Sequence, residues 1–271
     1  MHPNHMKAIT LYESGLSTAQ VAKECGYKSH VSVLNILGKN SIPTRNREQY
    51  MVGKSNARKY CLLEDFYSYG VNTEAKAYLL GLLYSDGWVS TSKPTSYTVG
   101  FGSTDLELVE IVAGILESNH HIREVKSKKA SYKRMYELRL DSKVLVSDLI
   151  ALGCVQRKSH ILTYPSDLGP DMDRHFIRGL WDGDGSVKHT RIAEGKPYLR
   201  LSLVGAKALL EGVRSVVETK LNVIGHIITH GAVFRLSYGK GAKLLYDYLY
   251  ANSTYSLSRK KNAGLLFANN E

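Results

Sequence analysis

The chain has 271 residues, of which 43% are hydrophobic and 23% are charged, proportions typical of a globular protein with one large domain or two smaller ones. No apolar run approaches the roughly 20 residues that cross a bilayer, and the polar N-terminal sequence MHPNHMK lacks the apolar middle of a secretory signal. We therefore expect a soluble, intracellular protein with no membrane partner. Lys and Arg outnumber Asp and Glu by 36 to 25, for a formal net charge of +11. This excess favours an anionic partner such as nucleic acid, the alternative being a charge that only aids solubility.

Residues 1–48 are predicted to form a small domain of three short helices. Ser17 and Ser29 stand at N-cap positions, and Gly26 ends the second helix. The apolar face of the third helix is expected at Val31, Leu34 and Leu37. Two helices separated by a glycine-containing turn resemble the helix-turn-helix of resolvase-like and phage DNA-binding proteins. The alternative is an ordinary three-helix packing module.

By that resemblance, the third helix would enter a major groove of DNA. The side chains expected to face the groove are Lys28, Ser29, His30, Ser32, Asn35 and Lys39. Arg45 and Arg47 follow closely and are expected to contact phosphates. Residues 49–72 are interpreted as a linker whose basic first half, with Lys54 and Arg58, lies along a DNA backbone. Its apolar second half is expected to pack on a larger domain.

Residues 73–271 contain an internal repeat, with copies at about 73–164 and 171–271. The first copy predicts a helix at 74–85, strands at 88–92 and 96–103, a helix at 105–118, strands at 121–127 and 132–141, and a helix at 142–153. The second predicts the same order from a helix at 174–183 to a helix at 240–250. This α-β-β-α-β-β-α order, found twice, predicts an α+β fold with two pseudo-symmetric antiparallel sheets.

Each predicted sheet has one apolar and one polar face, because in the strand at 198–205 leucines alternate with Arg200 and Ser202. Arg139 and Arg235 are predicted to hold matching positions on the two polar faces. These faces and the adjoining basic loops are expected to contact DNA rather than to be merely solvated. The loop residues are Lys126, Lys128, Lys129, Lys133 and Arg134 in the first copy and Lys188, Arg191 and Lys196 in the second.

The helix that opens each copy carries small residues four positions apart. Gly81 and Ser85 form this pattern in the first copy, and Gly179 and Gly183 form it in the second. Residues at i and i+4 share one face of a helix, so each helix offers a smooth stripe to another backbone. We expect the two helices to pack on each other about a pseudo-twofold axis.

Each of these helices ends in an Asp-Gly pair. Gly87 and Gly185 are expected to end the helices in the left-handed conformation. Asp86 and Asp184 then converge at helix ends whose dipole is already negative. A divalent cation with oxygen ligands, such as Mg²⁺, would relieve that repulsion. The alternative, two exposed acids at ordinary helix ends, leaves their repetition unexplained.

The two segments, LLGLLYSDG at Leu79–Gly87 and IRGLWDGDG at Ile177–Gly185, resemble the motif of LAGLIDADG homing endonucleases in the single-chain, two-motif form. The resemblance runs from about residue 73 to the C-terminus and implies two αββαββα units whose saddle-shaped sheets straddle duplex DNA. It implies a monomeric enzyme that makes site-specific double-strand breaks with Mg²⁺, or with Mn²⁺ in its place. It also implies the cytoplasm of a bacterial or phage-infected host.

The resemblance assigns the catalytic metal ions to Asp86 and Asp184, with the backbone carbonyls of Ser85 and Gly183 as further ligands. Such ions would polarise the scissile phosphate, help activate a water molecule and stabilise the leaving 3′ oxygen.

The resemblance also places one catalytic lysine near the attacking water in each copy. These are Lys158 and Lys260, with Lys261 open as an alternative to Lys260. The same fold serves RNA maturases, and relatives that have lost the acids act as DNA-binding transcriptional regulators. Both acids remain here, which favours cleavage. The target sequence, the host element (an intron or a free-standing gene) and the site that the helix-turn-helix reads, target or promoter, stay open.

Overall fold

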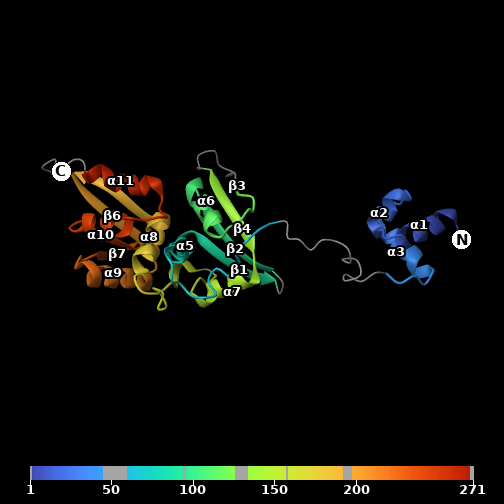
Figure 1. Ribbon diagram of the computed structural model, residues 1–271, viewed down its shortest axis with the longest axis horizontal. Coiled ribbons are helices and arrows are strands. Elements are labelled where there is room, and N and C mark those ends of the chain that lie inside the picture. The colour runs from blue at the N-terminus through green and yellow to red at the C-terminus, as the bar shows by residue number, and fades with distance from the viewer. Residues whose placement is uncertain are drawn as a thin grey trace. The chain divides into compact units, whose positions relative to one another are not determined.

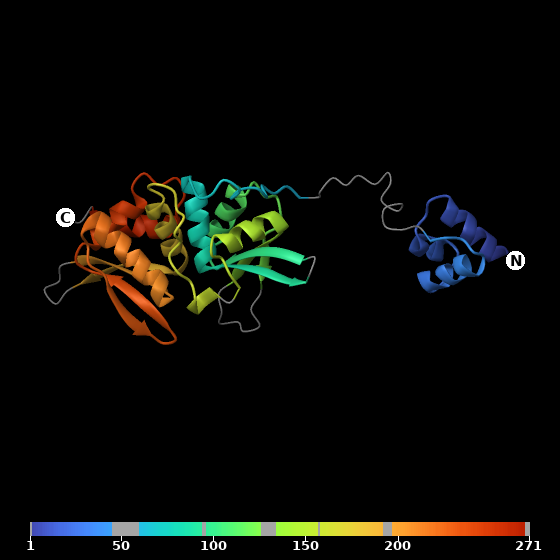
Figure 2. The same ribbon diagram turned by 90° about the horizontal axis from the view of Figure 1, so that it is seen from below.

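The computed structural model describes residues 2–44, 60–93, 96–125, 134–156, 158–191 and 197–268. The chain divides into two compact units, Met1–Arg58 and Lys59–Glu271, each of which is traced in Figures 1 and 2. Within the described ranges, no helix is long and apolar enough to cross a membrane. Several basic residues predicted to bind DNA lie outside these ranges: Arg45, Arg47, Lys54, Arg58, Lys126, Lys128, Lys129, Lys133 and Lys196.

The small unit consists of the three predicted helices. They are α1 (Pro3–Glu13), α2 (Thr18–Glu24) and α3 (His30–Lys39). Ser17 and Ser29 cap α2 and α3 as expected, and Ser17 forms a capping box with Gln20. Gly26 lies between these helices at φ 72°, in the left-handed region. The three helices share one apolar core around Ala8, Val21 and Leu37.

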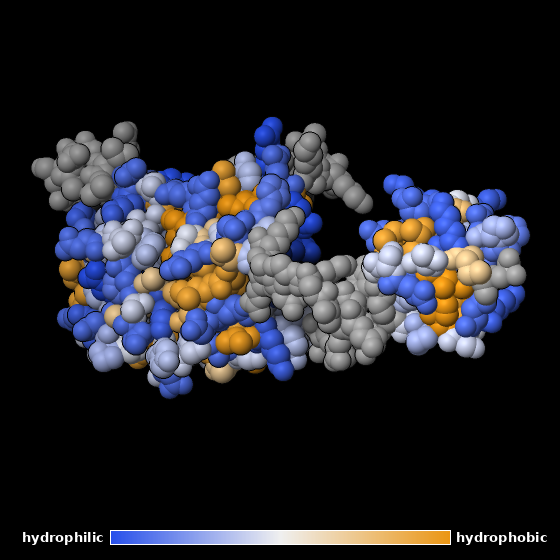
Figure 3. All heavy atoms as spheres, turned by 45° about the vertical axis from the view of Figure 1, so that its right-hand side comes forward, coloured by the Kyte–Doolittle hydropathy of each residue, from blue (hydrophilic) through white to orange (hydrophobic). Residues whose placement is uncertain are grey.

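The buried face of α3 differs from the predicted one. Leu37 is buried as expected, but Val31 is 49% exposed and Leu34 is 36% exposed, while Val33 and Ile36 are buried instead. Both sets have helical spacing, so the pattern alone does not decide which set faces α1 and α2. Apolar residues therefore reach the surface of this unit among hydrophilic ones (Figure 3).

The candidate groove-facing residues of the small unit lie at or near its surface. Ser32 is half-buried, and the others are exposed: Lys28, Ser29, His30, Asn35 and Lys39.

The larger unit contains the two predicted repeats, each with a four-stranded antiparallel sheet. Repeat 1 comprises α5 (Glu74–Ser85), β1 (Gly87–Lys93), β2 (Ser96–Ser103), α6 (Leu106–Ile115), β3 (Arg123–Val125), β4 (Met135–Asp141) and α7 (Lys143–Ala151). Repeat 2 comprises α8 (Asp173–Asp184), β5 (Gly185–Arg191), β6 (Pro197–Gly205), α9 (Lys207–Leu221), β7 (His226–His230), β8 (Val233–Tyr238) and α10 (Ala242–Tyr250). The strand orders, β1-β2-β4-β3 and β5-β6-β8-β7, are equivalent, and the predicted α+β fold is confirmed.

The strand register corrects one predicted correspondence between the repeats. Gly87 pairs with Phe101 and Gly185 with Leu203, which aligns the two sheets. The residue of β4 opposite Gly102 is then Glu137, and the residue of β8 at the same place, opposite Val204, is Arg235. Arg235 therefore matches Glu137, and the predicted match with Arg139 is wrong. A slip of two residues leaves every side chain on the same face, so the alternating pattern could not reveal it.

The segment before α5 joins the core of the larger unit. Tyr67 and Val71 are buried, and Val71 forms a β-bridge with Leu168. Leu62 and Phe66 pack partly buried against the same core, as the apolar half of the predicted linker was expected to do.

Helices α5 and α8 lie side by side between the two sheets (Figures 1 and 2), and their glycines allow the contact. A Cβ atom at Gly81 would lie 2.2 Å from the carbonyl oxygen of Phe176, and one at Gly179 would lie 2.2 Å from that of Tyr78. Only a residue without a side chain fits at either place. The predicted packing of the two motif helices is therefore present.

A buried polar cluster also ties the repeats together at the N-terminal end of α5. Arg178 of α8 is fully buried and donates to a Glu74 carboxylate oxygen at 2.6 Å and to the carbonyls of Tyr255 and Leu249 at 2.7 and 2.9 Å. Glu74 also accepts from the backbone N–H of Thr254 at 2.8 Å. These bonds satisfy a charge that would otherwise be costly to bury.

We expect Gly179→Ala to lower the free energy of unfolding of the larger unit by about 3 kcal/mol, because the new methyl group meets a backbone carbonyl that cannot move aside. Denaturant titration followed by tryptophan fluorescence measures this, since both tryptophans, Trp88 and Trp181, belong to this unit. The matched control is Gly114→Ala in α6, where a Cβ atom would meet nothing within 4 Å. The control is expected to be stabilising by roughly 0.5–1 kcal/mol. Equal midpoints for the two variants would contradict the prediction.

Candidate functional site

Each motif helix passes directly into the first strand of its repeat. Asp86 is the C-cap of α5 and Asp184 is the last residue of α8, while Gly185 has an extended conformation, with φ −88° and ψ 165°. Neither Gly87 nor Gly185 has a positive φ, so the predicted left-handed caps are wrong. Both glycines are needed for another reason, because a Cβ atom would lie 2.7 Å from Leu83 Cα or 2.4 Å from Trp181 Cδ1. The chain turns back against the last turn of its own helix.

The two acids converge where the helices end. A Cβ atom at Gly183 would lie 3.1 Å from Asp86 Oδ2, which places the carboxylate of one motif against the backbone of the other. Burial, and then the negative charge of Asp184, raise the pKa of Asp86 to about 6, although Lys158 and Lys260 oppose the rise. Burial also raises the pKa of Asp184. The site therefore concentrates negative charge that its two lysines only partly neutralise.

Two lysines cap the two motif helices in the same way. Lys158 Nζ donates to the α5 carbonyls of Leu83, of Tyr84 at 2.8 Å and of Ser85 at 3.3 Å. Lys260 Nζ donates to the corresponding α8 carbonyls: Trp181 at 2.6 Å, Asp182 at 2.7 Å and Gly183 at 3.2 Å. A cation at a helix C-terminus is favourable because it satisfies carbonyls that have no partner within the helix.

Lys260, rather than Lys261, holds the position equivalent to Lys158. Both lysines belong to the extra helix α11 (Ser258–Ala268). Lys260 is 3% exposed and bonds to the end of α8, whereas Lys261 Nζ donates to the Ser253 carbonyl at 3.2 Å. Burial lowers the pKa of both capping lysines, to about 8 for Lys260. Each of these lysines therefore loses its proton more readily than an exposed lysine does.

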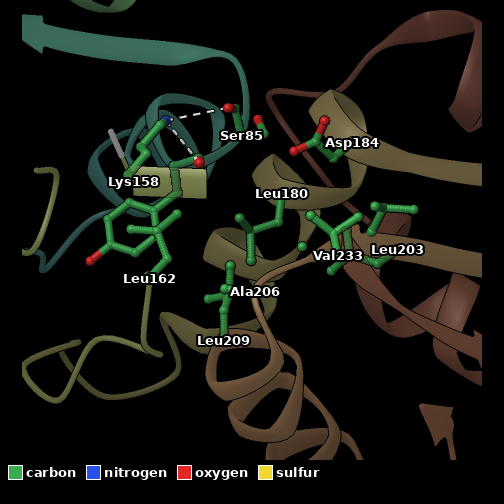
Figure 4. Close-up of a pocket in the computed structure, with 12 residues that line it drawn as sticks. Ser85, Lys158, Leu162, Leu180, Asp184, Leu203, Ala206, Leu209 and Val233 are labelled. Carbon is green, nitrogen blue, oxygen red and sulfur yellow. Dashed lines mark hydrogen bonds between the residues drawn. The ribbon is translucent and has the colours of Figure 1, made fainter. Parts of the chain in front are cut away.

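A cavity of about 210 Å³ opens between the two helix ends. Figure 4 shows Ser85 and Asp184 facing each other at its polar end, with Lys158 bonded to the carbonyls of α5. Its opposite wall is apolar and includes Leu180 and Leu209.

The donor set at the helix ends fits a hard divalent cation. Two carboxylates with raised pKa values, Asp86 and Asp184, supply oxygen ligands and uncompensated charge. The Ser85 and Gly183 carbonyls, the other predicted ligands, also accept bonds of 3.3 and 3.2 Å from the lysines, and each retains a second lone pair. Within the described ranges, no three His, Cys, Asp or Glu side chains gather as a metal cage. A cation here would complete its coordination with water or substrate oxygens, as Mg²⁺ commonly does.

The sixth motif position, which the sequence showed as Tyr84 in one copy and Asp182 in the other, supports the lysines. Asp182 is fully buried and accepts bonds of 2.7 Å from Tyr78 Oη, Tyr250 Oη and the Leu257 backbone N–H. Leu257 immediately precedes the helix that carries Lys260. Tyr84 Oη donates to the Leu152 carbonyl at 2.5 Å, in the segment that leads to Lys158. The two aligned motifs show this difference in residue type, but not the shared role.

The polar faces of the sheets extend outward from the acids. In repeat 2, Lys188, Arg200 and Arg235 line a groove of about 330 Å³, and Asp184 also lines it. In repeat 1, Arg139 is exposed on the face, and Arg134 is paired with Glu124 at 3.6 Å near the hairpin. The side chain of Arg191, which is also predicted to bind DNA, lies outside the described part of the structure.

The comparisons with known proteins agree with this architecture. Residues 73–148 match the family of the LAGLIDADG-like domain, and the chain therefore contains a LAGLIDADG-like domain. The fold is similar to that of the homing endonuclease I-WcaI bound to its DNA recognition sequence, with a TM-score of 0.53 and 13% identity over 79% of this chain and 95% of that one.

Two further solved structures are similar at lower TM-scores. I-DmoI in complex with DNA and Mn has a TM-score of 0.46 and 22% identity, over 67% of this chain and 98% of that one. Full-length DUF199/WhiA from Thermatoga maritima has a TM-score of 0.49 and 12% identity, over 77% and 65%. A search of curated proteins found no significant match.

We expect Asp86→Asn to stabilise the cation-free protein at pH 7.5 by about 1 kcal/mol and to leave it nearly unchanged near pH 4. The folded state holds the Asp86 proton up to about pH 6, whereas an ordinary Asp releases it near 3.8. The stability that the Asp86 proton contributes is therefore fully present below pH 3.8 and is lost as the pH rises through 6. The figure is smaller than full conversion of the shift because the carboxylate is partly exposed. Denaturant midpoints in chelator at both pH values test this, and an equal difference at both would contradict it.

Proposed function

We propose that this protein is a site-specific DNA endonuclease of the homing type, which hydrolyses phosphodiester bonds in both strands with divalent metal ions. The observation that carries the proposal is the convergence of Asp86 and Asp184 at paired helix ends, each beside a capping lysine. The LAGLIDADG-like match and the fold shared with a DNA-bound homing endonuclease support it. Since one chain supplies both acids, the active species is a monomer.

The proposed roles follow from the positions of the side chains. Asp86 and Asp184 hold divalent cations, Mg²⁺ or Mn²⁺, with the Ser85 and Gly183 carbonyls beside them. When bound, the cations supply Lewis-acid polarisation of the phosphate and stabilise charge on the leaving oxygen.

The two lysines act through the helix ends that carry the acids. Lys158 and Lys260 fix the last turns of α5 and α8, and so the geometry of the acids, and their charges offset part of the carboxylate repulsion. Their lowered pKa values suit proton exchange with a nearby water near neutral pH.

The basic polar faces are proposed to hold the duplex. Lys188, Arg200 and Arg235 line the groove beside Asp184, where they contact phosphates and base edges. The small unit, residues 1–48, is proposed to extend the recognised site through α3, with 49–72 as the connection to the nuclease repeats at 73–271. A transcriptional regulator or an RNA maturase on the same fold is the alternative. The paired acids favour cleavage over both.

We expect Asp86→Asn or Asp184→Asn to reduce double-strand cleavage roughly thousandfold, because each removes a charged oxygen ligand of the cation. Cleavage of a duplex library in Mg²⁺, with chelator as a blank, measures it. Binding should persist, because the change removes a negative charge near DNA. The matched control is Asp247→Asn in α10, which pairs with Lys243 at 2.7 Å far along the chain from both motifs.

Two outcomes would contradict the cleavage proposal. Sequence-specific binding by the wild type without cleavage in Mg²⁺ would support the regulator. Stimulated splicing of an intron RNA, with no DNA cut, would support the maturase.

We expect Lys28→Glu combined with Lys39→Glu to shorten the protected region of the target in a nuclease footprint. Both lysines are exposed on the small unit, near the ends of α3, and a reversed charge repels the phosphates. Lys7→Glu combined with Lys23→Glu provides the matched control, since it makes the same change of net charge at exposed side chains of α1 and α2. An unchanged footprint length would count against a role of this unit in target recognition and would favour promoter binding.

A further inference from the structure

The polar faces of the two sheets carry opposite charges at one matched position. Glu137 of repeat 1 and Arg235 of repeat 2 occupy equivalent places in the register. An acid on a face that would lie against DNA is unfavourable unless it serves another group. The contacts of Glu137 identify that group, and the inference drawn from them rests on the proposed function.

Glu137 is the sheltered centre of an ion-pair cluster. Its side chain is 9% exposed and accepts from Arg139 Nη2 at 3.0 Å and from Arg123 Nη2. The two arginine side chains are 55% and 54% exposed, so the acid is sheltered while the arginines remain accessible to a ligand. Burial raises the pKa of Glu137, but the bonds and charges of the two arginines outweigh it and leave the pKa below the usual range. The acid is therefore ionised near neutral pH.

Trp88 supports the same cluster from the other side. The Arg139 guanidinium lies over the Trp88 ring, 5.3 Å from its centroid. The ring itself lies flat on Gly100, where a Cβ atom would be only 2.1 Å from Trp88 Cε2. Arg139 is thus stacked on an aromatic face and bonded to a carboxylate, two contacts that restrict its rotamers before any ligand binds. Trp88 follows Asp86 by two residues, which places the cluster beside the paired acids.

Repeat 2 shows no counterpart of this arrangement within the described ranges. Ser186 and Ser202 take the register positions of Trp88 and Gly100, and Ser237 takes that of Arg139. Arg235 contacts His230 at 2.6 Å instead of a carboxylate. The repeat 2 face thus offers cations suited to phosphates, whereas the repeat 1 face offers arginines held in a fixed orientation.

We propose that Glu137 is a positioning residue that sets the target specificity of the repeat 1 half-site, by holding Arg139 and Arg123 with their guanidinium edges toward the bases. A guanidinium fixed before binding meets a guanine O6/N7 edge without the entropy cost of ordering a long side chain. Trp88 is a second positioning residue, which fixes the plane of Arg139. The repeat 2 face contributes mainly affinity through phosphates.

The test is selection of bound duplexes from a randomised library, in the full chain carrying Asp86→Asn and Asp184→Asn so that no cleavage occurs. Glu137→Gln is compared with Glu124→Gln, which makes the same charge change on the neighbouring strand β3, where Glu124 pairs only loosely with Arg134. We expect Glu137→Gln to reduce the base preference roughly tenfold at adjacent positions in one half of the target, with the other half unchanged. Glu124→Gln should leave both halves unchanged.

A second variant keeps the proposal falsifiable if Glu137→Gln unfolds, which tryptophan fluorescence would reveal. Arg139→Lys keeps the charge but loses the planar group that stacks on Trp88, so the same positions should lose preference while total affinity changes little.

The opposite result would be a simple electrostatic role. If Glu137→Gln and Glu124→Gln both tightened binding to every duplex alike, with unchanged base preferences, the positioning role would be overturned. Failure to select any sequence would overturn this inference together with DNA recognition itself. Selection without cleavage by the parent chain would overturn only the proposed endonuclease activity.

Discussion

The close contact of α5 and α8 is the constraint on which the larger unit depends. At Gly81 and Gly179 the two backbones lie so close that a methyl group on either residue would overlap the other helix. This contact fixes where both helices end. Each sheet begins at its helix end, so the same contact also fixes how the two sheets are placed relative to each other. The buried Arg178 and Glu74 pair holds the other end of the helices. The positions of the acids and of the polar faces follow from this one interface.

At the ends of α5 and α8, two acids in an unfavourable environment lie beside two lysines that partly offset their charge. Burial raises the pKa of both Asp86 and Asp184, and the charge of Asp184 adds to the rise at Asp86. Both acids also lie at helix C-terminal ends, where the helix dipole is unfavourable for a negative charge. Lys158 and Lys260 donate hydrogen bonds to the last carbonyls of α5 and α8, and among the described residues no ion pair joins them to the two acids. The acids thus keep a charge that a ligand can satisfy, while the helices that carry them remain stable. Such a division between stabilising and reactive groups is expected where a site gives up stability for function.

The pseudo-symmetry of the fold does not extend to the surface. The repeats share element order and register, yet Glu137 stands where Arg235 does, and Tyr84 stands where Asp182 does. At the sixth motif position the two side chains serve one purpose with different chemistry, because both hold the segment that leads to a capping lysine. On the polar faces, the exchange of Glu137 for Arg235 instead gives the two repeats different charged surfaces. A single chain can treat the halves differently, whereas a symmetric dimer cannot.

The sequence by itself determined the repeat, the element order, the glycine stripe and the paired acids, because these depend on periodicities and spacings within one segment. Tertiary structure decided the rest. Which apolar set of α3 is buried depends on the helices packed against it, and the match of Arg235 with Glu137 depends on a two-residue register that alternation cannot reveal. The role of Gly87 and Gly185 came from a close approach rather than from a left-handed φ. Only contacts between distant segments could distinguish Lys260 from Lys261, since both belong to the same turn of helix.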